Sequence, residues 1–338
     1  MVKLSLFIAA LVVGGVATAQ VKGQQDPDNF VKVEKAADSS LGGVPWKWVA
    51  VDADFGPLPA SMHVYRSSDS LKGRPEIAYY VSVPLKDKSV LFTSQVGYGK
   101  RLKPSEYYQQ EQQPLLVINT SFFSFKTNGN LNLVVKDGKI LAWNQPSRRH
   151  KDSVVSYIYT TRSALGIDRR RHADVAWIFT DSTQEVPYAF EDGPVVARGA
   201  DSVPKLEAMH NKHWRRWEME TAVGGGPVLV HDGKIRVTNE EEGLFIKGEK
   251  DIHPRSAMGY TRDGRIIVLA VQGRTPGVAS GVTLAEEAKV LLDLGCYEAL
   301  NLDGGGSSCM LVNGKETIKP SDKEGERPVP AVFIIKKS

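Results

Sequence analysis

The sequence has little cysteine, little excess charge and no long apolar run beyond its first residues, and each absence excludes a class of protein. Two cysteines, Cys296 and Cys309, are too few for a disulfide scaffold and form no Cys-x-x-Cys zinc pair. Lysine and arginine number 43 against 39 acidic residues, a formal net charge of +4. Basic clusters at 169–172 and 214–217 are interpreted as solvated surface, so we expect no nucleic-acid partner.

Several catalytic motifs are missing as well. The chain has no Walker A sequence, no Rossmann glycine spacing, no His-Glu-x-x-His and no Gly-x-Ser-x-Gly. These absences argue against nucleotide-coupled chemistry, against a zinc protease and against a hydrolase of the serine-elbow type.

The N-terminus has the pattern of an export signal. Lys3 precedes an apolar segment at 4–16, and Ala17-Thr18-Ala19 supplies the small residues of a cleavage site. This segment is too short to span a bilayer, and no later stretch is longer. We therefore expect a signal peptide at 1–19, a flexible extension at 20–45 and one domain at 46–338. The mature protein is expected to be periplasmic or extracellular, without a membrane span.

Turn signals predict that antiparallel sheet dominates the domain. Asp-Gly or Asn-Gly pairs lie between strand-like runs at 137–138, 232–233, 263–264 and 313–314. Such pairs accept the positive φ angles of tight hairpins. Each pair therefore predicts a hairpin.

One helix is clearly signalled. Thr283 and Glu286 form a capping box, apolar residues from Leu284 onwards share one face, and Gly295 can end the helix. Strands at 266–271 and 298–302 flank it, which predicts a strand-helix-strand crossover with the two strands paired in parallel. A weaker helix at 105–112 precedes a buried strand at 115–118. The expected fold class is α+β, a mixed and largely antiparallel sheet with several tight hairpins and at least one crossover.

The loop after the second crossover strand is the strongest candidate site. Asn301 and Asp303 lead into Gly304, Gly305 and Gly306, and Ser307 and Ser308 follow. Glycines let backbone N–H groups approach an oxyanion closely. The alternative is a tight turn between two strands. If the loop reverses the chain as a hairpin, Cys309 lies opposite residue 300, and a bridge between Cys296 and Cys309 is an open alternative.

Other segments are candidates to join this loop. Asn119 ends the buried strand at 115–118, and Glu220 precedes a glycine run at 224–226. His253 and Arg255 begin a strand, and a guanidinium suits a phosphate or carboxylate. For each of these residues the alternative is an ordinary surface or packing role.

Taken in order, these motifs resemble the phosphodiester glycosidase family over residues 79–334. The resemblance rests on 119–123, 224–227 with 230–233, 253–259, Gly273-Arg274, 281–284 and 301–308. It implies an α+β catalytic domain with a surface cleft, and hydrolysis of a sugar-1-phosphodiester such as an N-acetylglucosamine-1-phosphodiester. Thr120 and Ser121 depart from the family, which commonly has glycine after the asparagine. The export signal favours a bacterial envelope enzyme acting on a carbohydrate phosphodiester.

The chemistry implied by the resemblance needs a carboxylate near the anomeric carbon and a cation near the phosphate. Asp303 is the first candidate for the carboxylate and Glu220 the second. Arg255, with Arg274, His253 and the amides of Gly304 to Gly306, is expected to bind the phosphate. Asn119, Asn301, Ser307 and Ser308 would bind sugar hydroxyls or phosphate oxygens. No cofactor is required by this pattern, a divalent cation beside Asp303 stays an open alternative, and the competing function is a non-catalytic glycan- or phosphate-binding protein.

Overall fold

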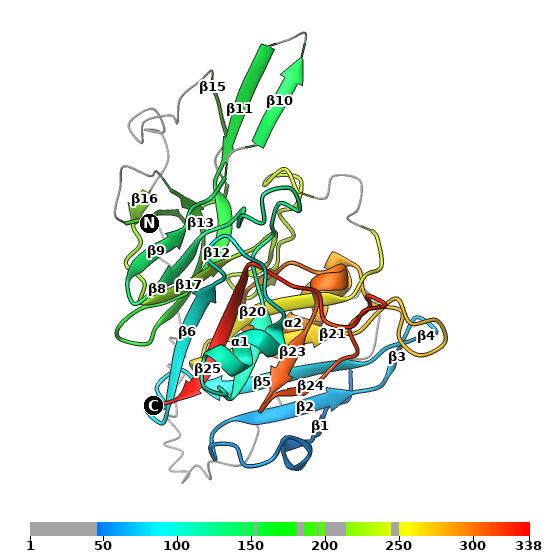
Figure 1. Ribbon diagram of the computed structural model, residues 1–338. Coiled ribbons are helices and arrows are strands. Elements are labelled where there is room, and N and C mark those ends of the chain that lie inside the picture. Colours follow the sequence, from blue (N-terminus) through cyan, green and yellow to red (C-terminus); the bar gives the residue numbers. More distant parts are fainter. Residues whose placement is uncertain are drawn as a thin grey trace, which may run out of the picture. The chain divides into compact units, whose positions relative to one another are not determined.

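A computed structural model describes residues 46–145, 147–151, 154–180, 186–194, 196–199, 214–244 and 250–338 (Figure 1). The expected signal peptide and extension lie outside these residues. The described residues all fall in one unit of the chain, Leu41–Ser338.

Three antiparallel sheets contain most of the strands. An eight-stranded sheet has the order β1 (Val49–Ala50), β2 (His63–Ser67), β5 (Ala78–Pro84), β21 (Arg265–Val271), β20 (Arg255–Thr261), β22 (Cys296–Asn301), β18 (Val228–His231), β19 (Lys234–Ile235). A seven-stranded sheet has the order β16 (Trp214–Arg216), β14 (Tyr188–Phe190), β13 (Ala173–Phe179), β12 (Arg162–Ile167), β17 (Thr221–Gly224), β8 (Val134–Lys136), β9 (Lys139–Ala142). A five-stranded sheet has the order β24 (Lys315–Glu316), β23 (Met310–Val312), β7 (Leu116–Asn119), β25 (Ala331–Lys337), β6 (Val90–Val96).

The remaining elements are small. One further sheet joins β10 (Ser147–Lys151), β11 (Val154–Thr160) and β15 (Val196–Gly199), and another joins β3 (Ser70–Leu71) and β4 (Arg74–Pro75). The α-helices of the described residues are α1 (Pro104–Gln110) and α2 (Leu284–Asp293), and the 3₁₀ turns are η2 (Asp52–Phe55) and η4 (Gly305–Ser307). Neither described α-helix is long and apolar enough to cross a membrane.

The four predicted hairpins are confirmed. They join β8 to β9, β18 to β19, β20 to β21 and β23 to β24. In three of them both turn residues have positive φ, as at Asp137 (51°) and Gly138 (72°). Aspartate, asparagine and glycine tolerate this left-handed conformation, which explains why the turn pairs were informative.

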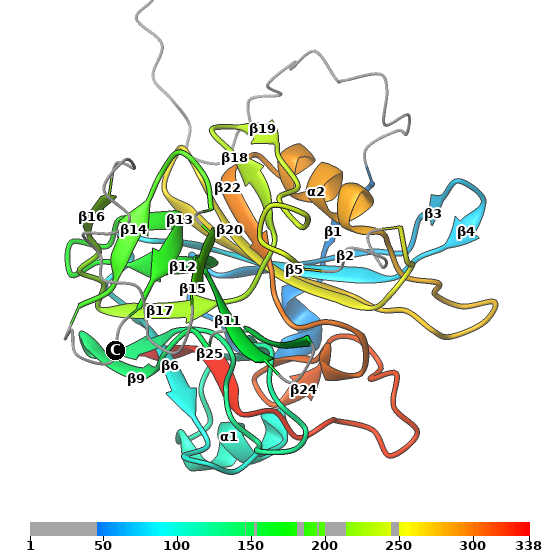
Figure 2. The same cartoon turned by 90° about the horizontal axis from the view of Figure 1, so that it is seen from above.

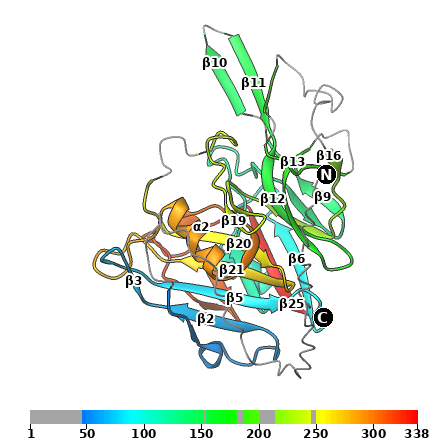
Figure 3. The same cartoon turned by 180° about the vertical axis from the view of Figure 1, so that it is seen from behind.

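The predicted α+β class is wrong, because the described part of the chain is built mainly of strands and has two short α-helices of 7 and 10 residues. The predicted parallel pair is also wrong. The helix α2 forms with its capping box as expected, but β21 lies between β5 and β20 (Figure 3). Strand β22 pairs with the other edge of β20. The hairpin at 263–264 places β20 between β21 and β22, so these two strands do not pair with each other. Every described strand pair is antiparallel.

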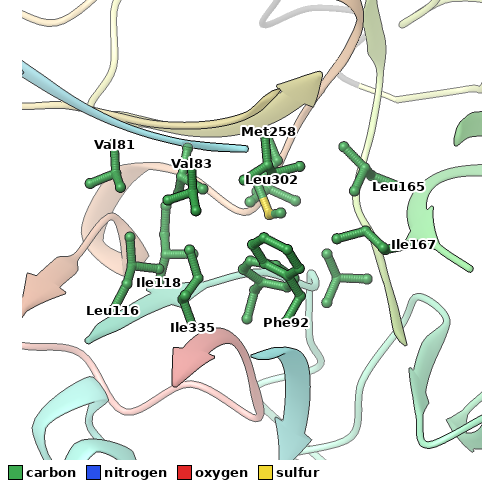
Figure 4. Close-up of a cluster of buried hydrophobic side chains, with 14 of the residues drawn as sticks. Val81, Val83, Phe92, Leu116, Ile118, Leu165, Ile167, Met258, Leu302 and Ile335 are labelled. Carbon is green, nitrogen blue, oxygen red and sulfur yellow. The ribbon is translucent and has the colours of Figure 1, made fainter. Parts of the chain in front are cut away.

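The main core lies where the inner faces of the three large sheets meet (Figure 4). Val81 and Val83 of β5 point into it, while Ala78 and Tyr80 of the same strand pack in the cluster under α2. This alternation follows from the two-residue period of a strand. Both faces of β5 are therefore covered, and the sheet provides a rigid base for the loops at its ends.

The two helices cover outer faces of sheets. Leu284, Ala288 and Leu291 of α2 pack on the eight-stranded sheet beside β18 and β22 (Figure 2). Tyr107 of α1 packs on the five-stranded sheet. Helix α2 thereby fixes the residues just before it, 281–283, against the start of β20.

The two cysteines are free and buried. Cys296 belongs to β22, whereas Cys309 precedes β23 in a different sheet. The expectation that Cys309 lies opposite residue 300 depended on a hairpin, and the structure shows Met310 paired with Ile118 instead.

Candidate functional site

The glycine loop crosses from one sheet to another. Strand β22 ends at Asn301 in the eight-stranded sheet, and β23 begins at Met310 in the five-stranded sheet. Leu302 is buried in the core, and the amide of Asp303 donates to the carbonyl of Thr120 at 2.7 Å. The backbone of Asp303 is therefore tied to the loop that follows β7, as the sequence predicted when it placed these two loops together.

Each glycine of the loop faces an arginine. A Cβ built on Gly305 would lie 3.0 Å from Nη2 of Arg274, and one built on Gly306 would lie 2.4 Å from Cζ of Arg327. A Cβ on Gly304 would lie 2.9 Å from the carbonyl oxygen of Pro254 and 3.8 Å from Cδ of Arg255. The three glycines thus allow three guanidinium-bearing side chains to approach one short loop.

Asp303 begins this loop, against which the arginines lie, and its carboxyl group is only partly exposed. Burial raises its pKa to about 7, against the lowering effects of the Ser307 hydroxyl, the Arg327 charge and the Gly304 amide. The Ser307 hydroxyl lies beside the carboxylate without completing a hydrogen bond to it. A carboxyl group with a pKa near neutrality can take up or release a proton during a reaction.

Arg274 supplies the accessible positive charge. It is exposed, and Nη2 donates to Nδ1 of His253 at 3.2 Å. Because a guanidinium only donates, this imidazole must carry its proton on Nε2. Burial and the nearby Arg274 and Arg255 charges lower the pKa of His253, so the ring is neutral near pH 7. Within the described part of the chain Arg274 has no carboxylate partner.

Arg255 lies deeper than the sequence suggested. It is 4% exposed, Nε donates to the carbonyl of Val282 at 3.1 Å, and Nη2 donates to the carbonyl of Asp251 at 3.0 Å. Behind it, the buried carboxylate of Glu287 has no hydrogen-bond partner, and burial raises its pKa to about 8 despite the Arg255 charge. Arg255 is therefore held by two backbone carbonyls beneath the loop and supports the loop from inside the protein.

The side chain of Asn119 links the glycine loop to strand β20 by hydrogen bonds. Its Nδ2 donates to the carbonyl of Asp303 at 2.5 Å, and its Oδ1 accepts from Ser256 Oγ at 2.8 Å and from the Cys309 amide at 3.1 Å. With both ends of the amide engaged, this side chain holds the loop in place.

Unpartnered polar atoms gather around the same loop. The side-chain oxygens of Thr120, Ser121, Ser308 and Asn301 are buried without a hydrogen-bond partner, although Asn301 Nδ2 donates to the carbonyl of Gly226 at 2.7 Å. Buried polar groups are normally paired, so such a cluster marks a place where a ligand or water completes the hydrogen bonds.

The glycine run at 224–226 lies against this strand end, but Glu220 does not. A Cβ on Gly225 would lie 2.4 Å from the carbonyl oxygen of Asn301, so this glycine is needed for close packing. Glu220 precedes the other end of β17 and pairs with exposed Arg169 at 2.8 Å. At about 3.3 Å per residue it is on the order of 13 Å from Gly224.

Sequence reasoning missed Arg327. It lies twenty residues beyond the glycine loop, in a segment without a motif, and forms a two-pronged ion pair with Asp322 at 2.8 and 2.9 Å. No local pattern signals its role, because the contact with Gly306 depends on the path of the chain between β24 and β25.

One group of side chains in the described residues could hold a metal ion, and it is not at Asp303. Donor atoms of His231, Asp232 and Glu298 lie within 4.8 Å of one another. Glu298 already accepts from Tyr260 at 2.6 Å and from the Val175 amide at 3.0 Å. This group does not include Asp303. A divalent cation beside Asp303 therefore stays a prediction.

Comparison with known proteins places this arrangement in context. The sequence profile described as phosphodiester glycosidase matches residues 112–336. A stretch of 102 residues is 33% identical to the N-acetylglucosamine-1-phosphodiester alpha-N-acetylglucosaminidase of Bos taurus, covering 30% of this chain and 19% of that protein. The match thus spans about a fifth of the curated relative.

Two solved structures share the fold. The catalytic domain of the zebrafish N-acetylglucosamine-1-phosphodiester alpha-N-acetylglucosaminidase matches with a TM-score of 0.53 at 20% identity, over 88% of this chain and 90% of that one. A hypothetical protein from Synechocystis matches with a TM-score of 0.55 at 14% identity, over 88% of this chain and 69% of that one.

Proposed function

Because this chain belongs to the phosphodiester glycosidase family, we propose that it is a hydrolase that cleaves a sugar-1-phosphodiester into a free sugar and a phosphomonoester. One observation supports this most strongly: the carboxyl group of Asp303, with a pKa of about 7, lies on a glycine loop beside Arg274 and Arg327. The loop pairs an acid or base with cations, as the reaction needs. N-acetylglucosamine is the proposed sugar, since the bovine relative is named for that substrate.

In this reaction the bond between the anomeric carbon and the phosphate oxygen breaks. The electron pair stays on the phosphate, and a water oxygen ends on the anomeric carbon, whose transition state resembles an oxocarbenium ion. Asp303 acts either as nucleophile on that carbon or as the base that activates water. Both roles require the ionised carboxylate.

Arg274 would take up the charge that develops on the departing phosphate. It is exposed, has no carboxylate partner among the described residues and lies next to the loop amides. Phosphate diesters are weak bases, so a fixed cation can replace much of a general acid. Neutral His253 orients Arg274, Arg255 stiffens the loop from below, and the unpartnered oxygens near Asn301 would receive sugar hydroxyls. Export to the periplasm or cell exterior remains part of the proposal.

Replacing Asp303 tests this assignment. Asp303→Asn keeps the size of the side chain and removes the charge, so kcat/KM for methyl N-acetylglucosamine-1-phosphodiester should fall about 100-fold or more. In the native enzyme kcat/KM should rise with pH through about 7, because the ionised form is the active one and the pKa of Asp303 is about 7.

Glu220→Gln is the matched control, since it neutralises a half-buried carboxylate in another part of the chain. Its kcat/KM should stay near that of the native enzyme. Full activity of a folded Asp303→Asn protein, or a larger loss in Glu220→Gln, would reject Asp303 as the reacting carboxylate. Retention of the diester without any turnover would favour a binding protein instead.

A further inference from the structure

Next to the glycine loop, two phenyl rings and Arg101, none of which the reaction above uses, form a cluster with Arg327. We call Arg101, Phe123, Phe125 and Arg327 the Phe125 platform. Cζ of Arg101 lies 5.2 Å from the ring centroids of both Phe123 and Phe125, and Cζ of Arg327 lies 5.6 Å from that of Phe125. The two rings are 4.7 Å apart.

Three loops hold this platform in place. Phe125 is at the tip of the loop after β7, which is closed by hydrogen bonds from the Ser124 amide to Gly129 and from the Asn128 amide to Ser124. Leu102 and Val329 exchange two backbone hydrogen bonds of 3.0 and 2.8 Å, which join the loop of Arg101 to the loop of Arg327. The positions of the rings and cations are therefore set by the backbone.

Phe125 remains 65% exposed although three side chains contact it. A single exposed phenyl ring is common on protein surfaces. Here a second feature accompanies it: among the described residues the guanidinium of Arg101 has no hydrogen bond and no ion pair, and it lies over the two rings. Arg327, in contrast, is neutralised by Asp322.

The platform lies within one sugar unit of the glycine loop. Cζ of Arg327 is 2.4 Å from the position that a Cβ on Gly306 would take and 5.6 Å from the centroid of Phe125, so the ring lies within about 8 Å of that position. The Arg101 guanidinium lies against the same ring. An apolar ring and the cation of Arg101 thus lie close to the glycine loop.

We propose that the Phe125 platform is a binding subsite for the part of the substrate beyond the scissile phosphate, and that it selects a sugar that carries a second anionic group. This inference rests on the proposed hydrolysis of a sugar-1-phosphodiester. The C–H face of a pyranose is apolar and covers the exposed ring of Phe125. A phosphate on the far side of that sugar meets Arg101, whose planar fork donates two parallel hydrogen bonds. The substrate class is therefore a chain of sugars joined by phosphodiesters.

Three synthetic probes separate the two contacts. All contain N-acetylglucosamine-1-phosphate, joined to methanol, to O6 of glucose, or to O6 of glucose 1-phosphate. Their dissociation constants are measured by calorimetry in the Asp303→Asn background, in which the probes stay intact. Hydrolysis of the methyl probe by the native enzyme is measured in parallel, because it tests the proposed function alone.

Phe125→Ala should weaken binding of both glucose probes about tenfold relative to the methyl probe. Arg101→Gln should weaken the glucose 1-phosphate probe about tenfold relative to the plain glucose probe, and Arg101→Lys should restore part of that preference. The matched control is Arg262→Gln, which removes a guanidinium lying 4.2 Å from the ring centroid of Tyr297, and it should leave both ratios unchanged.

Each result bears on the proposal. Hydrolysis of the methyl probe by the native enzyme supports the proposed function. If Phe125→Ala then leaves the affinity ratio of the glucose and methyl probes unchanged, or Arg101→Gln leaves that of the two glucose probes unchanged, the subsite alone is refuted. If the native enzyme hydrolyses none of the probes, the proposed function fails and the subsite fails with it. Equal changes in Arg262→Gln would show a general effect of charge and would also refute the subsite.

Discussion

At the scale of single residues, the glycines of the loop are explained by what faces them. Gly305 and Gly306 leave the space that Arg274 and Arg327 occupy. The sequence correctly placed Asp303, the glycines and the loop after β7 together. It ranked Arg255 above Arg274, because nothing in a one-dimensional pattern shows that carbonyls of Asp251 and Val282 already hold the Arg255 guanidinium.

Arg274 should matter more for the reaction than for stability. Arg274→Gln removes an exposed cation from the proposed phosphate site, so kcat/KM should fall about 100-fold, or about 2.7 kcal/mol, with an unchanged melting temperature. Arg274→Lys should recover part of the loss. Steady-state kinetics and thermal melts check both variants.

Arg255→Gln provides the contrast. Because Arg255 is buried and lies beside Glu287, its loss should lower the melting temperature as well as the activity. Native kinetics in Arg274→Gln, or a drop in its melting temperature equal to that of Arg255→Gln, would contradict the phosphate role of Arg274.

At the scale of elements, the sequence predicted local structures such as turns and a helix start correctly, but beyond the hairpins it did not predict which strands pair in the sheet. The turn pairs predicted four hairpins, and the capping box at Thr283 and Glu286 predicted α2. The hairpin at 263–264 predicted β20 as one neighbour of β21, but the other neighbour, β5, was not predicted, because the sequence does not show which strand occupies the second edge. The helix returns β22 to the free edge of β20, since β5 and β20 already flank β21.

Two glycines with left-handed backbone, Gly305 in the glycine loop and Gly264 in a hairpin, allow the effect on activity to be separated from the effect on stability. Gly305 has φ +64° and faces Arg274, whereas Gly264 has φ +81° with no atom within 4 Å of its built Cβ. Alanine at either position should cost about 1 kcal/mol of unfolding free energy, since both have left-handed backbone. Only Gly305→Ala should also displace Arg274 and lower kcat/KM, by about tenfold or more.

Chemical denaturation and kinetics on the two alanine variants provide the comparison. Equal activity in both, at equal loss of stability, would mean that the close approach of Arg274 to the loop is not used by the reaction. If Gly264→Ala also lost activity, the lower activity of Gly305→Ala would be explained by its lower stability and not by displacement of Arg274.

At the scale of the whole molecule, the site depends on contacts between segments far apart in the chain. Asp303, Arg274, Arg327 and the loop after β7 meet because β22 and β23 belong to different sheets. A crossing of this kind cannot be inferred from turn residues, since a glycine run predicts a reversal as readily as a passage between sheets. Arg327 and the Phe125 platform were missed for that reason.

The central claim is that water attacks the sugar and not the phosphorus. Hydrolysis of methyl N-acetylglucosamine-1-phosphodiester in ¹⁸O-labelled water, followed by mass spectrometry of both products, tests it directly. Cleavage between the anomeric carbon and oxygen predicts the label in the sugar hydroxyl and none in methyl phosphate. Label in methyl phosphate would show attack at phosphorus and would contradict the glycosidase mechanism assigned to Asp303.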